Sequence, residues 1–309
     1  DILGHLDPTM IRMLQDLTGI DPLEIPLDSK EVMSLFQNTS ALGIKPEDIG
    51  GTKLGALGIP EFGTDFAMQM LMDTKPQYFS DLVRIAGLAH GTDVWLGNAQ
   101  TLIKEGKATI STAICTRDDI MIYLIQKGLD SEESFKIMEM VRKGKVASGK
   151  CKEWPEWKQD MIDHGVPDWY IWSCERIKYM FPKAHAAAYV MMAWRVAYCK
   201  VFYPLAYYTA YFSIRATAFD YEKMAMSPVR LEHYIAEYKA KKAEGTISNT
   251  EEDELGVMRI VQEMHARGYE FTPIDIYKAK ARTFQIIDGK IMPSFKVISK
   301  VGEVAGESI

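Results

Sequence analysis

The feature that most constrains this chain is a long helix-forming run that begins just after Pro182. The run, AHAAAYVMMAWRVAYCKVFY, starts at Ala184 and contains neither proline nor glycine before Pro204. Proline suits the first turn of a helix, because its φ angle is fixed and its missing N–H is not needed there. We therefore predict a helix over 184–200 and, beyond Pro204, a second helix over 205–215.

Charged and aromatic side chains gather at the predicted start of this helix. Lys183 and His185 lie in its first turn, with Tyr179 before it and Tyr189 after it. A helix N-terminus favours an anion, a lysine adds positive charge, and aromatic rings can stack on a base. The pattern indicates a ligand with a phosphate and a base. A buried helix with a core His185 explains the same residue types equally well.

The overall charge argues against a generally basic nucleic-acid-binding protein, because the net charge is −6 and the pI is about 5.6. The cations nevertheless form four local clusters. These are Arg142, Lys143, Lys145, Lys150 and Lys152; Arg176, Lys178 and Lys183; Lys239, Lys241 and Lys242; and Lys278, Lys280 and Arg282. We interpret the third cluster as a solvated helix face, and the others as candidate contacts for a polyanion.

Cysteine usage and hydropathy indicate a cytoplasmic protein. The four cysteines are far apart and form no CxxC pair, which argues against structural zinc and a disulfide scaffold. No signal peptide opens the chain. The apolar stretch 184–214 is interrupted by Arg195, Lys200 and Pro204, so we expect two buried helices and no membrane span.

The remaining patterns predict a mainly α chain with a small α+β region near its end. Helices are expected over 7–17, 29–37, 64–72, 81–88, 117–126, 131–143, 229–243 and 250–267, with two short helices within the tryptophan-rich segment 146–172. Asp7, Ser80 and Ser131 are the expected N-caps of three of them, and Phe66 should face inward. Residues 41–61 look like a connection. Short strands are expected over 268–271 and 282–287, and Asp288-Gly289 predicts a hairpin turn.

Two further places have residues suited to ligand contact. The loop 87–98 contains three glycines, which allow close backbone approach, and His90, Thr92 and Asn98 offer polar contacts. Most such loops are merely turns. Arg117 opens a helix, where its guanidinium could bind a triphosphate. The adjacent Asp118 and Asp119 diverge by about 100° on a helix, so they are poorly placed to share a metal ion.

Five ordered blocks resemble the bacterial family C replicative DNA polymerases, the DNA polymerase III alpha subunits. They are DILGHLDPTMIRMLQDLTGID, GIPEFGTDF, GLAHGTDVWLGNAQ, RDDIMIYLIQKGL and FPKAHAAAYVMMAWRVAY, the last followed by YPLAYYTAYFSIRA. The resemblance is closer to the Gram-positive PolC type and covers nearly the whole chain. It implies the end of the palm over 1–60, a fingers domain over 61–217, and the start of a duplex-binding domain over 218–309. A truncated helix-hairpin-helix motif would lie at 298–309.

The resemblance implies DNA-directed DNA polymerase activity in chromosomal replication. Asp1 matches the third palm carboxylate, which with an upstream Asp-x-Asp pair would hold two Mg²⁺ ions; this piece alone should be inactive. Arg117 and Lys183, with Arg142 less strongly, would bind the triphosphate of the incoming dNTP. His185, Tyr179 and Tyr189 would shape the base-pair pocket, and His90, Thr92 and Asn98 would complete its floor. The expected contacts to primer-template DNA are Lys278, Lys280, Arg282, Lys300 and Gly302.

The resemblance also implies a sliding clamp as partner, through a tail beyond residue 309. The alternative hypothesis is a noncatalytic helical nucleic-acid-binding or scaffold module that uses the same basic clusters. A helical phosphohydrolase is disfavoured, because the six histidines are scattered without HxxEH or His-Asp spacing.

Overall fold

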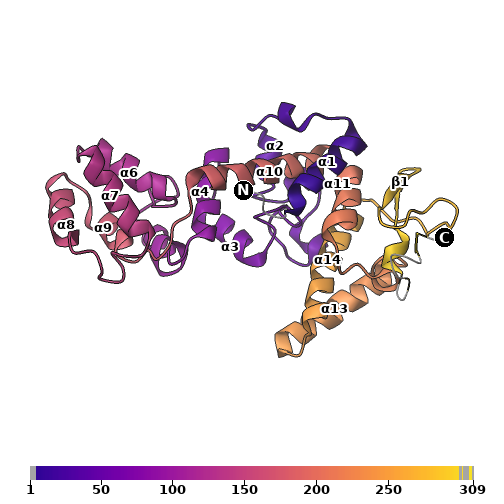
Figure 1. Ribbon diagram of the computed structural model, residues 1–309. Helices are drawn as coiled ribbons and strands as arrows, with labels where there is room; N and C mark the ends of the chain where they lie inside the picture. Colours follow the sequence, from indigo (N-terminus) through magenta and orange to yellow (C-terminus); the bar gives the residue numbers. More distant parts are fainter. Residues whose placement is uncertain (1–4, 299–300, 302–305, 308–309) are drawn as a thin grey trace. The chain divides into compact units, whose positions relative to one another are not determined.

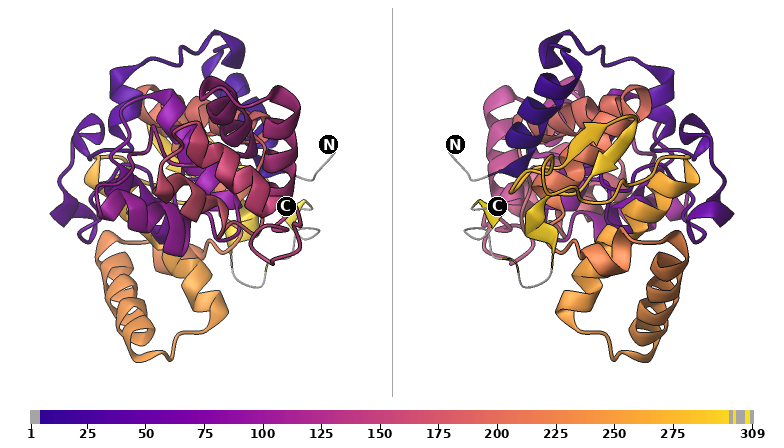
Figure 2. Two further views of the ribbon diagram at one scale, coloured as in Figure 1. Left: turned by 90° about the vertical axis from the view of Figure 1, so that its left-hand side faces the viewer. Right: turned by 90° about the vertical axis from the view of Figure 1, so that its right-hand side faces the viewer.

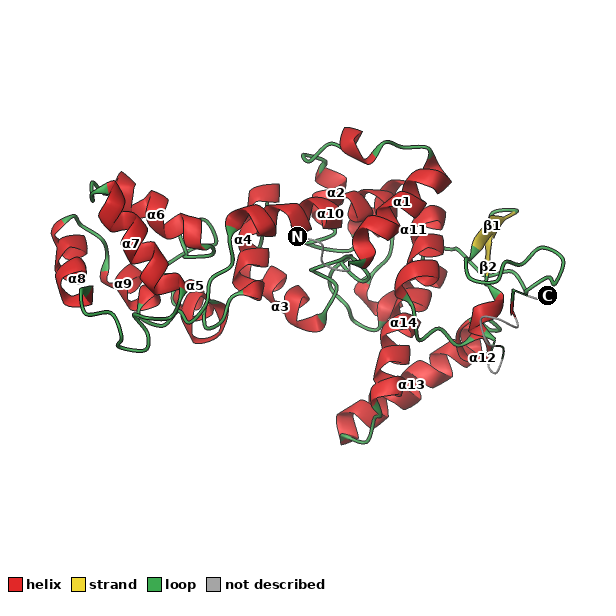
Figure 3. Ribbon diagram, in the orientation of Figure 1, coloured by secondary structure: helices red, strands yellow, loops and turns green. Residues whose placement is uncertain are grey.

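The computed structural model describes residues 5–298, 301 and 306–307, and it is mainly helical with one small antiparallel sheet (Figures 1 and 3). The chain forms two compact units. Unit 1 combines residues 1–63 with 192–309, and unit 2 contains residues 64–191. The chain returns from unit 2 to unit 1 within the helix α10. The mainly α fold class with a small β-hairpin, predicted from the sequence, is confirmed.

Unit 1 begins with two helices and an irregular, buried segment. The helices are α1 (Leu6–Thr18) and α2 (Lys30–Ser34), and 3₁₀ turns follow at Ser40–Leu42 and Pro46–Ile49. Leu54, Leu57 and Ile59 are at most 3% exposed, because this segment packs into the core of unit 1. Residues 41–61 are therefore more than a connection.

The second part of unit 1 contains, among its described residues, the end of α10, which begins in unit 2, and four further helices. They are α10 (Lys183–Phe202), α11 (Pro204–Ala210), which continues into a π-helical turn at Tyr211–Arg215, α12 (Tyr221–Met224), α13 (Pro228–Glu244) and α14 (Asn249–Ala266). The break at Pro204 was predicted correctly. Helices α13 and α14 pack along each other as an antiparallel pair, which both views in Figure 2 show.

A two-stranded hairpin closes the described part of unit 1. Strands β1 (Gln285–Ile287) and β2 (Lys290–Met292) pair in antiparallel register, and Asp288 and Gly289 both have positive φ angles. This conformation fits a type I′ turn, so the predicted hairpin is confirmed. The strand expected over 268–271 is wrong, because only Phe271 forms an isolated bridge, to Ile291. A single bridge does not extend into a ladder.

The core of unit 1 contains one buried ion pair. Lys200 and Glu263 are completely buried, and Lys200 Nζ lies 2.9 Å from a carboxylate oxygen of Glu263. Lys200 also donates to the carbonyl oxygens of Gly55 and Leu57, at 2.7 Å each, and the Tyr208 hydroxyl donates to Glu263 at 2.6 Å. This network attaches the irregular segment to α10, α11 and α14.

Unit 2 contains, within the described residues, seven complete α-helices and the first part of α10. They are α3 (Asp65–Thr74), α4 (Phe79–His90), α5 (Gln100–Lys104), α6 (Arg117–Gln126), α7 (Ser131–Arg142), α8 (Trp154–Asp163) and α9 (Asp168–Cys174). The positions of the predicted helices are confirmed here, but several boundaries and caps differ.

Three of the expected caps and one inward residue were wrong. Asp130, and not Ser131, caps α7 by accepting the N–H groups of Glu132 and Glu133. Ser80 lies inside α4, which has no cap from it, and His5 precedes α1 where Asp7 was expected as the cap. Phe66 is 50% exposed, because the buried face of α3 passes through other positions.

Candidate nucleotide-binding site

The segment 178–181 is bonded to three of the predicted site regions in unit 2. Thr92 N donates to Tyr179 O at 2.9 Å, and Arg117 N donates to Phe181 O at 3.3 Å. Met180 N donates to Arg142 O at 3.3 Å. The end of α4, the start of α6 and the end of α7 are thus attached to the chain that leads into α10.

Two glycines make this close approach possible. A Cβ atom on Gly91 would lie 3.0 Å from the carbonyl oxygen of Tyr179, and one on Gly144 would lie 2.7 Å from that of Lys178. Gly144 also has a φ angle of +69°, which favours glycine. In the 87–98 loop, glycine therefore serves contact with the protein's own backbone, which the sequence alone did not distinguish from contact with a ligand.

The start of α10 is already capped by an acidic side chain. The backbone N–H of Lys183, the first residue of α10, donates to Oδ2 of Asp118 at 2.8 Å. Its neighbour Asp119 accepts the N–H groups of Cys115 and Thr116 at the start of α6. The two aspartates thus cap two different helices, and one N–H at the start of α10 is not available to a phosphate.

Four rings pack together beside this helix start. His90 stacks on Phe181 with ring centroids 4.8 Å apart, and Tyr189 stacks on Phe181 at 6.0 Å. His185 meets the edge of the same ring at 5.8 Å. His90, His185 and Tyr189 are predicted site residues, whereas Phe181, at the centre of the group, was not predicted. Its position within the FPKAHAAAY block was the available signal.

The cations at this surface differ in their ion pairing. Arg142 forms two hydrogen bonds to Glu139, at 2.5 and 2.8 Å, and they lower the pKa of Glu139 to about 2. Lys178 Nζ lies 2.7 Å from Asp93. By contrast, Arg117 and the exposed Lys183 have no ion pair within the part of the chain that the structure describes. Positive charge is therefore least balanced at Arg117 and Lys183.

Three of the predicted site residues, Asn98, Thr92 and Tyr179, differ in exposure. Asn98 is completely buried; its amide nitrogen donates to Asp93 O at 2.9 Å and to Ser173 O at 3.1 Å, and the Ser173 hydroxyl donates to its oxygen. Its side chain thus connects the loop to α9. Thr92 and Tyr179 are exposed, the latter by 45%.

The comparisons with known proteins agree on one family. Residues 7–165 match the bacterial DNA polymerase III alpha subunit finger domain. The chain is 53% identical to DNA polymerase III PolC-type of Streptococcus suis, 52% identical to that of Bacillus subtilis and 50% identical to that of Caldanaerobacter subterraneus. Each match covers all 309 residues of this chain and 21% of the relative's length.

This chain belongs to the PolC-type DNA polymerase III family. The resemblance noted from the five sequence blocks is confirmed. The chain spans about a fifth of the length of these relatives.

The second set of predicted contacts lies in unit 1 of this PolC-type chain. Lys278 and Lys280 are exposed, and Arg282 pairs with Glu307 at 2.7 Å. Asp1, Lys300 and Gly302 lie outside the described residues, as does most of the expected helix-hairpin-helix start. Within residues 5–298 and the few described beyond them, no group of three His, Cys, Asp or Glu side chains could hold a metal ion. Nor does any helix there combine the length and apolar character of a membrane-spanning segment.

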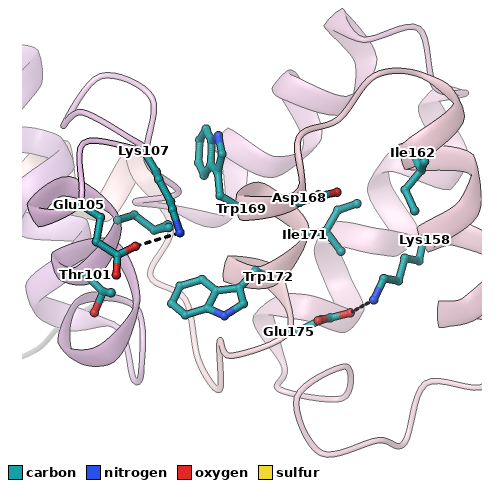
Figure 4. Close-up of a pocket in the computed structure, with 11 residues that line it drawn as sticks. Thr101, Glu105, Lys107, Lys158, Ile162, Asp168, Trp169, Ile171, Trp172 and Glu175 are labelled. Atoms are coloured by element: carbon teal, nitrogen blue, oxygen red, sulfur yellow. Dashed lines mark hydrogen bonds and ion pairs between the residues drawn. The ribbon is translucent and has the colours of Figure 1, made fainter.

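A separate pocket of about 850 Å³ lies in unit 2. Its walls come from α5, α8 and α9, and Figure 4 shows Trp169 and Trp172 extending toward the segment that carries Glu105 and Lys107. Ion pairs join Lys107 to Glu105 at 2.9 Å and Lys158 to Glu175 at 2.8 Å. None of the residues predicted to bind dNTP lines this pocket.

Proposed function

We propose that this chain is part of a DNA-directed DNA polymerase for chromosomal replication, and that unit 2 binds the incoming dNTP. The single observation that supports the proposal is the backbone connection of Thr92, Arg117 and Arg142 to segment 178–181. Side chains from these three regions and from segment 178–181 thereby come to one surface. Cations and exposed rings at one surface suit a ligand that has both a triphosphate and a base.

In this proposal, Arg117 and Lys183 bind the triphosphate, because neither has an ion pair in the described part of unit 2. Arg142 contributes less, because Glu139 balances its charge. The exposed His185 and Tyr179 contact the base or sugar, whereas His90 and Tyr189 pack against Phe181 and against each other. Thr92 offers a hydroxyl at the rim, and Asn98 keeps the loop in place.

The expected pair of Mg²⁺ ions depends on Asp1, outside the described residues, and on carboxylates of the Asp-x-Asp pair. We therefore assign no metal-dependent step to the residues of units 1 and 2. In the same way, primer-template contacts at Lys278, Lys280 and Arg282, a sliding clamp partner and a cytoplasmic location remain parts of the proposal. The boundaries of the two compact units, after residues 63 and 191, differ from those of the predicted fingers domain over 61–217. The extent of the fingers domain is therefore also part of the proposal.

Steady-state kinetics of the full-length polymerase test the dNTP assignment. Lys183→Ala and Arg117→Ala should each raise the KM for dNTP about tenfold or more, because a charge-assisted hydrogen bond to phosphate is lost. Lys136→Ala is the matched control, since Lys136 is an exposed lysine of unit 2 that pairs with Glu132. Unchanged KM values together with lower thermal stability would contradict the assignment. A noncatalytic nucleic-acid-binding module would bind DNA with no dependence on dNTP at all.

A further inference from the structure

We propose that the lysine loop, residues 143–152 between α7 and α8, binds phosphates of the unpaired template strand. The inference rests on the proposed function, because a template is expected beside unit 2 only if the incoming dNTP binds there. The lysines that carry it are exposed, and they have no ion pair within the part of unit 2 that the structure describes. They are Lys145, Lys150 and Lys152.

The positive charge of the lysine loop is not balanced by its surroundings. Residues 137–155 contain five cations but only two acids, Glu139 and Glu153. Glu139 pairs with both Arg142 and Lys143, so one carboxylate serves two cations. The segments bonded to 178–183 add no excess of acids, because they contribute equal numbers of each sign. These residues are Arg117, Lys178, Lys183, Asp93, Asp118 and Asp119. The loop is therefore an unbalanced positive surface that attracts a polyanion.

The backbone of the lysine loop is fixed, so its lysines start from defined positions. Lys145 N donates to Met140 O at 3.0 Å, and Lys150 N donates to Lys145 O at 2.9 Å. The second bond brings the backbones of these two lysines together. Val146 and Cys151 are at most 8% exposed and anchor the loop in unit 2. A loop that is already ordered loses less conformational entropy when it binds a ligand.

The lysine loop lies next to the surface proposed for the dNTP. A Cβ atom on Gly144 would lie 2.7 Å from the carbonyl oxygen of Lys178, and Met180 N donates to Arg142 O at 3.3 Å. Between these two contacts, Tyr179 is 45% exposed. Cations beside an exposed aromatic ring are the combination that binds single-stranded nucleic acid, because the cations follow the backbone and the ring can stack on a base.

A strand of DNA suits these lysines better than the other polyanions do. Arg117 and Lys183 are already assigned to the triphosphate, and flexible lysines suit successive phosphates that need no fixed geometry. The chain belongs to a DNA polymerase family, which favours DNA over an acidic protein segment. The unpaired template continues from the base that pairs with the dNTP, so its phosphates start close to this surface.

Fluorescence anisotropy with the full-length polymerase and a labelled primer-template tests the proposal. One DNA has a long unpaired template overhang, and the other has a single unpaired template nucleotide. The variant Lys145→Ala/Lys150→Ala/Lys152→Ala should bind the long overhang about tenfold more weakly at about 0.1 M salt. Its slope of log affinity against log salt should fall by about two, because each phosphate contact to a single strand contributes about 0.7. Its affinity for the second DNA should stay within about twofold of the wild type.

Two matched variants separate the lysine loop from a general effect of charge. Replacing the same three lysines with arginine keeps the charge and should retain the slope. The variant Lys104→Ala/Lys127→Ala/Lys136→Ala removes equal charge from exposed lysines elsewhere in unit 2, and it should bind both DNAs as the wild type does. Thermal melts of all variants should match the wild type, because the replaced side chains are exposed.

The proposal is wrong if the lysine-loop alanine variant binds the long overhang as tightly as the wild type, or if it loses as much affinity for both DNAs. It is also wrong if the matched alanine variant loses as much. A higher KM for dNTP at saturating DNA, with an unchanged salt slope, would assign the loop to the triphosphate and overturn the proposal. The KM values of Arg117→Ala and Lys183→Ala test the proposed function separately, so the two failures can be told apart.

Discussion

Replacing Glu263 with alanine is expected to lower the free energy of unfolding of unit 1 by about 3–5 kcal/mol. Both Glu263 and Lys200 are completely buried, and the carboxylate is the counter-ion of Lys200. Without it, Lys200 would retain only its two bonds to Gly55 O and Leu57 O, and the Tyr208 hydroxyl would lose its acceptor. A buried charge without a counter-ion costs much more free energy than the loss of one neutral hydrogen bond.

The double variant Lys200→Met/Glu263→Leu distinguishes this mechanism from a simple loss of packing. Removing both charges leaves no uncompensated ion, so the double variant should be at least about 2 kcal/mol more stable than Glu263→Ala. Glu263→Gln should fall between them. It keeps an acceptor for Tyr208 but removes the charge beside Lys200.

The pH dependence gives a second test. Burial lowers the pKa of Lys200 to about 8, despite the opposing effect of Glu263. Because the pKa of lysine in an unfolded chain is about 10.4, the unfolded state binds more protons between these two values. The stability of the wild type relative to Lys200→Met should therefore increase as the pH rises from about 8 to 10.4.

Hydrogen exchange measured by mass spectrometry is the appropriate assay, because a chain with two compact units need not unfold in one step. Amides of α10, α14 and the segment 53–60 should exchange faster in Glu263→Ala, while those of α6 and α7 stay protected. The reasoning is refuted if Glu263→Ala and the double variant are equally stable, or if the loss is below about 1 kcal/mol.

Three smaller predictions concern charges at the surface. In thermal melts, Asp118→Ala should destabilise α10 by about 1 kcal/mol, because the cap of its first N–H is lost, and Asp118→Asn should lose less stability. Asp118→Asn should also lower the KM for dNTP, because it removes a negative charge beside Lys183. A hydrogen bond with Asp160 raises the pKa of Glu133 to about 7 in the folded protein. Protonated Glu133 therefore stabilises the fold fully below about pH 4.5, and this contribution is lost as the pH rises through 7. Glu133→Gln should then be more stable than the wild type at pH 8, by under about 1 kcal/mol for so exposed a group; a wild type equally stable at pH 8 would contradict this. Lys278→Ala and Lys280→Ala should each reduce the salt dependence of DNA binding by about one counter-ion in titrations at several salt concentrations, and an unchanged slope would exclude them as phosphate contacts.

Much of the fold follows from local sequence signals. Pro204 separates α10 from α11, and Asp288-Gly289 forms the hairpin turn, because these residues restrict the backbone whatever surrounds them. Caps were harder to predict. Ser131 and Asp130 are both good capping residues, and only the observed hydrogen bonds decide between neighbours.

The division into units could not be read from the sequence. The irregular segment 41–61 has few periodic features, yet Lys200 on α10 donates to two of its carbonyl groups and fixes it in the core. That interaction joins positions about 145 residues apart. Likewise, the sequence of 146–172 predicts two short helices rich in tryptophan but not which tryptophans are buried. Trp169 and Trp172 line a pocket, because α8 and α9 leave that side of α9 exposed.

The candidate site shows why the density of cations alone misplaces a phosphate. Arg142 and Lys178 each lie in a cluster of cations in the sequence, but Glu139 and Asp93 balance these two side chains. Arg117 lies outside the four cation clusters, and Lys183 shares one with Lys178. The two residues come together because Arg117 N bonds to Phe181 O and Lys183 N bonds to Asp118, which is next to Arg117. A phosphate is attracted to charge that is not already balanced. The pairing of each cation, which depends on contacts distant in sequence, therefore decides where the triphosphate is expected.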